Sequence, residues 1–239
     1  MATYVLVHGG GHGGWCYHKV ARLLRAEGHE VHCPSLTGLA DRAHLVRADT
    51  DLETHIEDVV RLLFYEDLSG VMLVGHSYGG MVITGVADRV PERIGHLVFL
   101  DAAHPGNGQS LVDVAPEMMA YARSTSRMVD GVELAMWPSM EIVTMMGITD
   151  PAETQWMLDR LTPQPWRTME QPLNLRNEAA LRAIPATDIN ASWSTRQPGA
   201  ATTRVPYPSS QVWEIDTGHD LMLTEPEQTA SMLLRLAPA

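Results

Sequence analysis

The segment at residues 71–82 constrains the fold of this chain most, because it joins an apolar strand to a helix through a Gly-His-Ser-Tyr-Gly sequence at 75–79. The pattern Gly-x-Ser-x-Gly in this context is typical of a very sharp strand-to-helix turn. Glycines are needed at both flanks, since a Cβ there would collide with the backbone. The turn lifts the Ser77 hydroxyl above the carboxyl end of the strand, at the positive N-terminus of the helix. We therefore predict that Ser77 is a nucleophile rather than a helix cap.

Strand and helix patterns alternate over the first hundred residues. Apolar runs at 4–7, 30–33, 71–76 and 96–100 are separated by amphipathic helical patterns at 15–26, at 52–64 and after the serine turn. Such alternation predicts a parallel sheet with right-handed crossovers. Further strands are expected at 186–190 and 211–215, followed by a last helix at 226–236. The expected fold class is α/β, with a mainly parallel six-stranded sheet in the order 2-1-3-4-5-6 and flanking helices.

The alternation stops at a Pro-Gly-Asn-Gly sequence at residues 105–108. From about residue 110 to 182 the periodicity is helical, and this stretch contains 9 of the 14 methionines and 3 of the 6 tryptophans. We predict a helical cap at 105–182, inserted into a core formed by residues 1–104 and 183–239. A methionine-rich cap favours an apolar, adaptable pocket, and ordinary helical core is the equal alternative.

Composition excludes several classes of partner for this chain of 239 residues. A net charge of -12 argues against binding nucleic acid or an anionic membrane surface through a broad basic face. No apolar run approaches membrane-spanning length, and the first residues enter a strand with no basic region or cleavage signal, which predicts a cytoplasmic protein. Cys16 and Cys33 are the only cysteines. They indicate core packing rather than a disulfide scaffold or a zinc site.

A serine hydroxyl is a poor nucleophile at neutral pH, so it needs a base and a group that orients the base. Of 11 histidines, His219 follows the last predicted strand, where this order of elements places the base. His76 is expected to turn into the packing beneath the serine. His8 and His12 flank a glycine-rich loop and are expected outside the reacting groups. His104 follows the 96–100 strand at the expected mouth of the pocket, and we predict that it contacts substrate.

The sequence leaves three alternatives for the acid that would orient the base. Its usual place, the loop after the first strand beyond the cap, reads Asn-Ala-Ser-Trp-Ser-Thr at 190–195 and has no carboxylate. Asp101 ends the strand that follows the serine helix and faces the same rim of the sheet, so it is the first choice. Asp188 is the second choice, although it is expected within a strand. The third alternative is that no acid is present.

Fixed hydrogen-bond donors are needed for the oxyanion that forms when the serine attacks a carbonyl. The glycine-rich loop after the first strand lets backbone amides approach closely. We assign the donors to the amides of Gly10 and Tyr78, each worth about 3 kcal/mol, and expect Gly9 to border the substrate. Neither Gly-x-Gly-x-x-Gly nor Gly-Lys-Ser/Thr spacing occurs at this helix start, so no nucleotide cofactor is expected. No metal and no other cofactor is predicted.

Together the segments 5–10, 12–15, 74–81, 97–102 and 218–219 resemble the α/β-hydrolase superfamily. The resemblance is to the esterase branch that includes plant methyl-salicylate and methyl-jasmonate esterases and hydroxynitrile lyases, and more closely to their bacterial esterase relatives. It implies that Ser77 and His219 are nucleophile and base, and that the Gly10 and Tyr78 amides hold the oxyanion. The acid position of the plant enzymes falls near Ser194 here. Other α/β-hydrolases carry the acid where Asp101 stands.

Two residues distinguish the chain from the lyases that it resembles. Those lyases carry a threonine at the place of Gly9 and a lysine directly after the catalytic histidine, where it would stabilise cyanide. Here the second position is Asp220, whose negative charge is expected to repel an anion. Dehalogenases of the same fold use an aspartate nucleophile, which Ser77 excludes.

The sequence therefore predicts a serine hydrolase that cleaves a carboxylic ester of a small, largely apolar substrate through an acyl-enzyme. One alternative is a lactonase or another cofactor-free reaction on a secondary metabolite. The other is a non-catalytic ligand-binding protein with an impaired triad. The expected partner is a small-molecule ester, and homodimer formation is left open.

Overall fold

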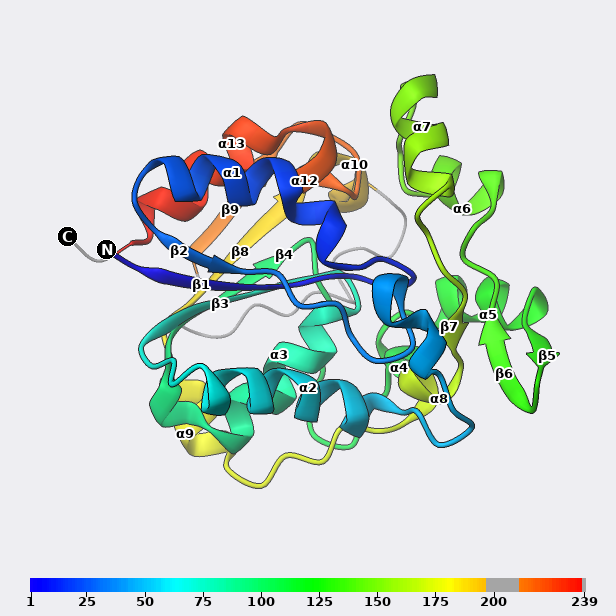
Figure 1. Cartoon of the computed structure of the whole chain (residues 1–239), viewed down its shortest axis with the longest axis horizontal. Helices are drawn as coiled ribbons and strands as arrows, with labels where there is room; N and C mark the ends of the chain where they lie inside the picture. The colour runs from blue at the N-terminus through cyan, green and yellow to red at the C-terminus, as the bar shows by residue number, and fades with distance from the viewer. Residues whose placement is uncertain (197–210, 238–239) are drawn as a thin grey trace.

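A six-stranded sheet runs through the middle of the molecule in the computed structural model, which describes residues 1–196 and 211–237 (Figure 1). The strand order is β2-β1-β3-β4-β8-β9, and neighbouring strands pair in parallel. The strands are β1 (Thr3–Val7), β2 (Glu30–His32), β3 (Val71–His76), β4 (Ile94–Leu100), β8 (Ala186–Ala191) and β9 (Gln211–Ile215). Counted along the chain this is 2-1-3-4-5-6, so the predicted fold class and strand order are confirmed.

Helices cover both faces of the sheet (Figure 1). One face carries α1 (His18–Ala26), α12 (Leu221–Thr224) and α13 (Pro226–Arg235), and the other carries α2 (Leu52–Tyr65), α3 (Gly79–Arg89) and α9 (Glu178–Ala183). Short helices lie in the connections: η1 (Gly14–Tyr17), η2 (Ala40–Leu45), η3 (Pro91–Arg93) and α10 (Ser192–Thr195). Covering both faces explains why the central strands are continuous apolar runs rather than alternating ones.

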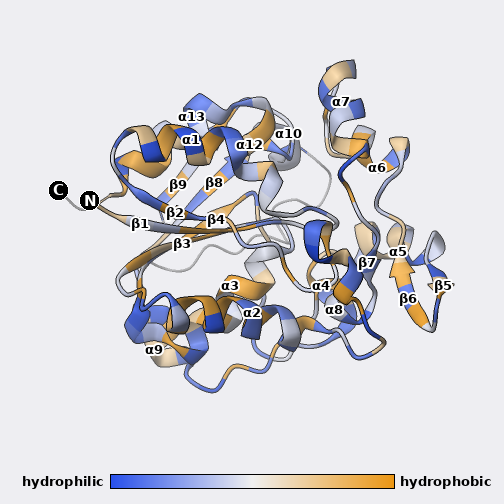
Figure 2. Ribbon diagram, viewed as in Figure 1, coloured by the Kyte–Doolittle hydropathy of each residue, from blue (hydrophilic) through white to orange (hydrophobic). Residues whose placement is uncertain are grey.

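The two elements that hold the serine turn, β3 and α3, are almost completely buried. All six residues of β3 are buried, as are ten of the eleven residues of α3. Figure 2 shows α3 as a largely hydrophobic helix beneath the sheet. Because side chains in a close-packed interior have few alternative positions, these elements give the turn a rigid base.

The inserted segment contains helices α4 (Leu111–Val114), α5 (Pro116–Ser124), α6 (Met140–Met145), α7 (Pro151–Leu158) and α8 (Arg167–Glu170). It also contains a small antiparallel sheet of β5 (Arg127–Val129), β6 (Val132–Ala135) and β7 (Gln164–Pro165), which the helical periodicity of this stretch did not predict. The physical reason is the turn between β5 and β6. Asp130 and Gly131 both have positive φ, +48° and +80°, which is the backbone of a two-residue hairpin turn.

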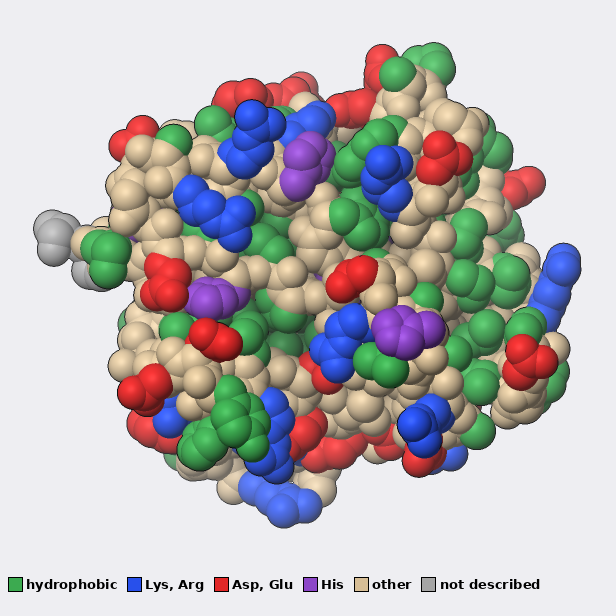
Figure 3. Space-filling view, in the orientation of Figure 1, with side chains coloured by type: hydrophobic (Ala, Val, Ile, Leu, Met, Phe, Trp, Pro, Cys, Tyr) green, Lys and Arg blue, Asp and Glu red, His purple; other side chains and the backbone are tan. Residues whose placement is uncertain are grey.

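Helix α9 falls within the range predicted for the cap but packs against α3 of the core. The chain therefore returns to the layer beneath the sheet before residue 183. Of the predicted core range 183–239, residues 197–210 and 238–239 lie outside the described residues. No helix in the described ranges is both long and apolar enough to cross a membrane. On the face in Figure 3, acidic and basic side chains are interspersed rather than gathered into one basic area.

Candidate active site

Ser77 lies at the turn between β3 and α3, with a φ of +52° that is unusual for a residue with a Cβ. Glycines make the turn sterically possible. A Cβ on Gly75 would lie 2.7 Å from the carbonyl oxygen of Gly79, and a Cβ on Gly79 would lie 2.7 Å from that of Val7. Backbone strain of this kind is concentrated at functional sites, so the turn has the geometry expected around a nucleophile.

Asp101 directly follows β4 and also has a positive φ, +47°. Its buried carboxylate accepts hydrogen bonds from three groups. The Nδ1 of His219 and the Oγ of Ser194 each lie 2.5 Å from Oδ2, and the amide of Ala191 lies 3.1 Å from Oδ1. Of the two carboxylates considered from the sequence, Asp101 is the one that the structure brings to His219.

The loop that carries Asp101 is fixed against the serine turn by the backbone. The Ala103 amide donates to the Ser77 carbonyl oxygen at 3.0 Å, and the Asp101 amide donates to the Ile189 carbonyl oxygen of β8 at 2.8 Å. Helix α3 can approach this loop only because residue 80 is glycine, since a Cβ on Gly80 would lie 2.1 Å from the Ala103 carbonyl oxygen. The nucleophile turn and the acid loop are thus held in one unit.

Ser194 of α10 stands near the position to which the resemblance assigns the acid of the plant enzymes. In this chain its hydroxyl donates to Asp101. The carboxylate itself comes from the end of β4, and the Ser194 hydroxyl contacts the same oxygen, Oδ2, as the His219 ring. No local pattern predicts this contact, because the two residues are 93 positions apart.

Asp188, the second candidate acid, lies within β8 as expected and is paired with His104. The His104 Nε2 lies 2.5 Å from the Asp188 Oδ1, and both side chains are only 4 % exposed. The His104 ring also stacks on Phe99 with ring centroids 4.0 Å apart. This burial argues against the predicted contact of His104 with substrate, because the stacking on Phe99 and the contact with Asp188 hold the ring inside the protein.

His219 lies between β9 and α12 and is held by its neighbours on both sides. Its amide donates to the Met146 carbonyl oxygen at 2.7 Å, and its own carbonyl oxygen accepts from the His76 Nε2 at 3.0 Å. With Nδ1 donating to the Asp101 carboxylate, the neutral ring keeps its lone pair on Nε2. A side chain that is 15 % exposed can present this nitrogen to a hydroxyl proton.

The glycine-rich loop that follows β1 passes directly over the serine turn. A Cβ on Gly9 would lie 2.7 Å from the His76 Nδ1 and 3.0 Å from the Ser77 Cβ. No hydrogen bond within the described ranges uses the amides of Gly10 or Tyr78, the two predicted oxyanion donors. Gly10 and Tyr78 therefore stay the predicted oxyanion donors.

Cap residues hold the next position of the loop. The Gly11 amide donates to the buried Gln164 Oε1 at 2.8 Å, and the Gly11 carbonyl oxygen accepts from the Thr162 amide at 2.8 Å. The Gln164 Nε2 donates to the Thr168 hydroxyl at 2.8 Å. Sequence reasoning missed Gln164, since the residues that it connects are 153 positions apart and no local pattern marks such a contact.

The remaining histidines around the serine are buried. Burial lowers the pKa of His8 and of His76 to about 3, so both rings are neutral at pH 7. As expected, His76 turns into the packing beneath Gly9. His12 is 1 % exposed and its Nε2 lies 3.1 Å from the Oδ2 of Asp220, which is fully buried. Asp220 is thus enclosed and pairs with an imidazole, and its repulsion of an anion stays a prediction.

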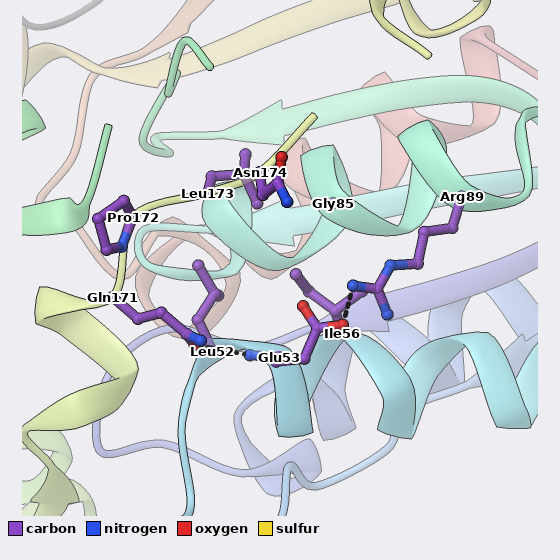
Figure 4. Close-up of a pocket in the computed structure, with 9 residues that line it drawn as sticks. All are labelled: Leu52, Glu53, Ile56, Gly85, Arg89, Gln171, Pro172, Leu173 and Asn174. Atoms are coloured by element: carbon purple, nitrogen blue, oxygen red, sulfur yellow. Dashed lines mark hydrogen bonds and ion pairs between the residues drawn. The ribbon is translucent and has the colours of Figure 1, made fainter. Parts of the chain in front are cut away.

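A surface hollow of about 170 Å³ lies away from this constellation, between α2, α3 and the segment that leaves the cap (Figure 4). The ion pair between Arg89 and Glu53 borders it, and the Glu53 amide donates to the Gln171 Oε1 at 3.0 Å. None of the predicted site residues lines it. We assign no part of the chemistry to this hollow.

The sequence of the chain matches a family profile and several known proteins. The profile of the alpha/beta hydrolase family matches residues 4–232. The chain is 37 % identical over 248 residues to the carbendazim hydrolyzing esterase of Nocardioides sp. strain SG-4G, a match that covers 99 % of this chain and 100 % of that protein. It is 39 % identical over 111 residues to methylesterase 1 of Arabidopsis thaliana, covering 45 % of this chain and 41 % of that protein.

Solved structures show the same fold. An extracellular alpha/beta-hydrolase from a Paenibacillus species, described as sharing structural and functional homology with tobacco salicylic acid binding protein 2, is similar with a TM-score of 0.81 and 22 % identity over the whole of both chains. The pyrethroid hydrolase PytH is similar with a TM-score of 0.77 and 24 % identity, covering 98 % of this chain and 96 % of that one.

Proposed function

The chain belongs to the alpha/beta hydrolase family, and we propose that it is a serine hydrolase that cleaves carboxylic esters of small, largely apolar molecules. The contact between the His219 Nδ1 and the Asp101 carboxylate carries this proposal. This contact orients the imidazole of His219. The carbonyl oxygen of His219 accepts from the Nε2 of His76, the residue directly before Ser77, so the His219 loop lies against the serine turn. A base held in one tautomer beside a strained serine turn is the arrangement that acyl transfer requires.

In the proposed reaction the His219 Nε2 accepts the proton of the Ser77 hydroxyl while its oxygen attacks the ester carbonyl carbon. The amides of Gly10 and Tyr78 donate to the oxyanion of the tetrahedral intermediate. The C–O bond of the ester then breaks, and the alcohol leaves with the proton from His219. A water molecule, deprotonated by His219, attacks the acyl-enzyme and releases the acid, which restores Ser77.

The names of the relatives support esters of small alcohols as the substrate class. One relative is named an esterase that hydrolyses carbendazim, and several are named methylesterases. A methyl leaving group needs little space beyond the serine. We therefore propose methyl esters with an aromatic or short aliphatic acyl part as the first substrates to examine.

The test is hydrolysis of a panel that contains p-nitrophenyl acetate and butyrate, methyl benzoate and carbendazim. We expect the wild-type protein to release acid and alcohol, and the Ser77→Ala variant to lose turnover. The matched control is Ser231→Ala on the exposed side of α13, which should keep full activity. Hydrolysis that survives in Ser77→Ala would overturn the proposed mechanism.

Two other results would move the assignment to another function. Ring opening of lactones without hydrolysis of any open-chain ester would identify a lactonase. Thermal stabilisation by a ligand that is never converted would identify a binding protein on a hydrolase fold.

A further inference from the structure

Asp220 is a fully buried carboxylate directly after the catalytic histidine, and it lies between two other histidines. Its Oδ2 is 3.1 Å from the His12 Nε2, and its Oδ1 is 3.4 Å from the His76 Nε2. A buried carboxylate is strongly unfavourable unless a positive charge and hydrogen bonds compensate it. The compensation available here identifies which of the two imidazoles is charged.

His12 has a hydrogen on both ring nitrogens in this arrangement. Its Nδ1 lies 2.8 Å from the carbonyl oxygen of Gly10, which can only accept, so Nδ1 donates. Its Nε2 faces the carboxylate of Asp220. Desolvation opposes the charged form, but the charge and hydrogen bond of Asp220 outweigh it and raise the pKa of His12. Burial instead keeps His76 neutral, with its pKa lowered to about 3.

The positive and the negative end of this ion pair lie near different reacting groups. Its positive end, the His12 imidazolium, bonds to Gly10 in the loop that supplies an oxyanion donor. Its negative end, the Asp220 carboxylate, lies beside His219. One ring nitrogen of His76, one of His219 and one carboxylate oxygen of Asp220 lie within 4.8 Å of one another. During attack on an ester, negative charge develops on the carbonyl oxygen and positive charge on the imidazole of His219.

We propose that the buried Asp220–His12 ion pair is a positioning device that fixes the Gly10 loop and places opposite charges behind the oxyanion and behind the His219 imidazolium. This inference rests on the proposed ester hydrolysis and assigns the two residues a role in it without contact with substrate. Dipoles that are already oriented need no reorganisation as charge separates, so the pair favours the transition state over bound substrate. Its removal should therefore lower kcat rather than raise KM.

The Asp220→Asn variant removes the negative charge of residue 220 and with it the positive charge of His12, while the side chain keeps its size and shape. The new amide can donate to the Nε2 of a neutral His12, whose Nδ1 still donates to Gly10. We expect kcat to fall about 10- to 100-fold, less than the loss of a direct oxyanion donor, with KM within about twofold of wild type. The rate at which a fluorophosphonate modifies Ser77 should fall by a similar factor, because that step uses the same charge separation without bound ester.

Asp88→Asn is the matched control, because Asp88 is also a buried carboxylate but lies in the last turn of α3, away from Ser77. It accepts from the amides of Arg176 and Asn177. We expect this variant to melt at a lower temperature with kcat unchanged. If Asp220→Asn does not fold, His12→Asn keeps a donor to the Gly10 carbonyl oxygen and removes the same positive charge.

The outcomes separate this inference from the proposed function. A folded Asp220→Asn protein with wild-type kcat and phosphonylation rate would overturn the inference and leave ester hydrolysis intact. A rise in KM at unchanged kcat would overturn it as well. If wild-type protein hydrolysed no ester, the proposed function would fail, and the ratio of phosphonylation rates would still decide whether the pair assists Ser77.

Discussion

Asp101 is a buried carboxylate directly after β4 that lies beside the imidazole of His219. It accepts hydrogen bonds from His219, Ser194 and the Ala191 amide, so its carboxylate is fixed from three directions. An acid held in this way selects the tautomer of the base and stabilises the imidazolium that forms in the reaction. The place of Asp101 at the end of a strand was readable from the sequence, whereas its three contacts come from segments about 90 residues or more away.

The Asp101→Asn variant is expected to lose about 10⁴-fold in kcat, because an amide at this position favours the wrong tautomer of His219. Steady-state hydrolysis of p-nitrophenyl acetate measures the loss. The comparison variant is Asp188→Asn, which removes the carboxylate that pairs with His104 instead. Near wild-type turnover in Asp101→Asn, together with a large loss in Asp188→Asn, would transfer the role to Asp188.

Gly9 is predicted to be intolerant of any side chain. A Cβ there would lie 2.7 Å from the His76 Nδ1 and 3.0 Å from the Ser77 Cβ, so Gly9→Ala must displace the serine turn or the loop. We expect kcat to fall about 100-fold, because a small displacement of reacting groups has effects of this size. Gly106→Ala, where the nearest atom is the flexible end of Gln109, serves as the control and should be close to wild type.

The residues that sequence reasoning missed or misplaced share one property. His104 was expected at the pocket mouth, yet it pairs with Asp188 inside the protein. For Asp220 only a repulsive charge was expected, and the structure pairs it with His12, 208 positions earlier. Motifs indicate which residues lie near the rim of the sheet. The direction of a polar side chain is decided by partners that the fold brings from distant segments.

The cap contacts both loops to which we assign the chemistry. The Met146 carbonyl oxygen at the end of α6 accepts from the His219 amide, and Gln164 of β7 accepts from the Gly11 amide. A Cβ on Gly218 would lie 2.7 Å from the Gly147 carbonyl oxygen, so the cap backbone packs closely on the histidine loop. Displacement of the cap would therefore disturb the base and the oxyanion loop together.

Gln164→Leu tests this connection. The side chain is fully buried, and its loss would remove the acceptor of the Gly11 amide and one of the hydrogen bonds of the Thr168 hydroxyl. We expect about 2 kcal/mol less stability in urea unfolding and a fall in kcat of about 10-fold. Gln155→Leu, on the exposed face of α7, should change neither quantity. Unchanged activity in a destabilised Gln164→Leu protein would show that the contact is structural only.

The small sheet of the cap was not predicted, although its turn carries a sequence signal. Strands of two to four residues are too short to show an alternating pattern against a background rich in methionine. The Asp130-Gly131 pair alone indicates a hairpin, since both residues must adopt positive φ. The helices and strands of the core were predictable, because their apolar runs are longer and regularly spaced.

Buried neutral histidines make the stability of the whole molecule sensitive to pH. In the folded state the pKa of His8 and of His76 is lowered to about 3, against 6.5 for an exposed histidine. Between these values the unfolded chain binds more protons, so stability decreases as the pH falls below 6.5. The pKa of His12 is raised. The contribution of His12 to the free energy of unfolding is therefore already complete below pH 6.5, and it does not offset the loss caused by His8 and His76.

We therefore expect the free energy of unfolding to decrease by about 2 kcal/mol for each of His8 and His76 at pH 5, since one pKa unit corresponds to about 1.4 kcal/mol. Urea unfolding at pH 7 and at pH 5 measures the change. His8→Gln keeps an acceptor for the Leu36 amide but does not titrate, and it should show the smaller decrease. An equal decrease in wild type and variant would contradict the assignment of His8 as neutral.

The direct test of the central claim, that His219 and Asp101 make the Ser77 hydroxyl reactive, is to label the protein with a fluorophosphonate and locate the adduct by mass spectrometry. We predict one adduct per chain, on the peptide that contains Ser77. We also predict that His219→Ala and Asp101→Asn slow its formation by about 10³-fold or more. An adduct on another residue, or a folded wild-type protein that stays unmodified, would contradict it.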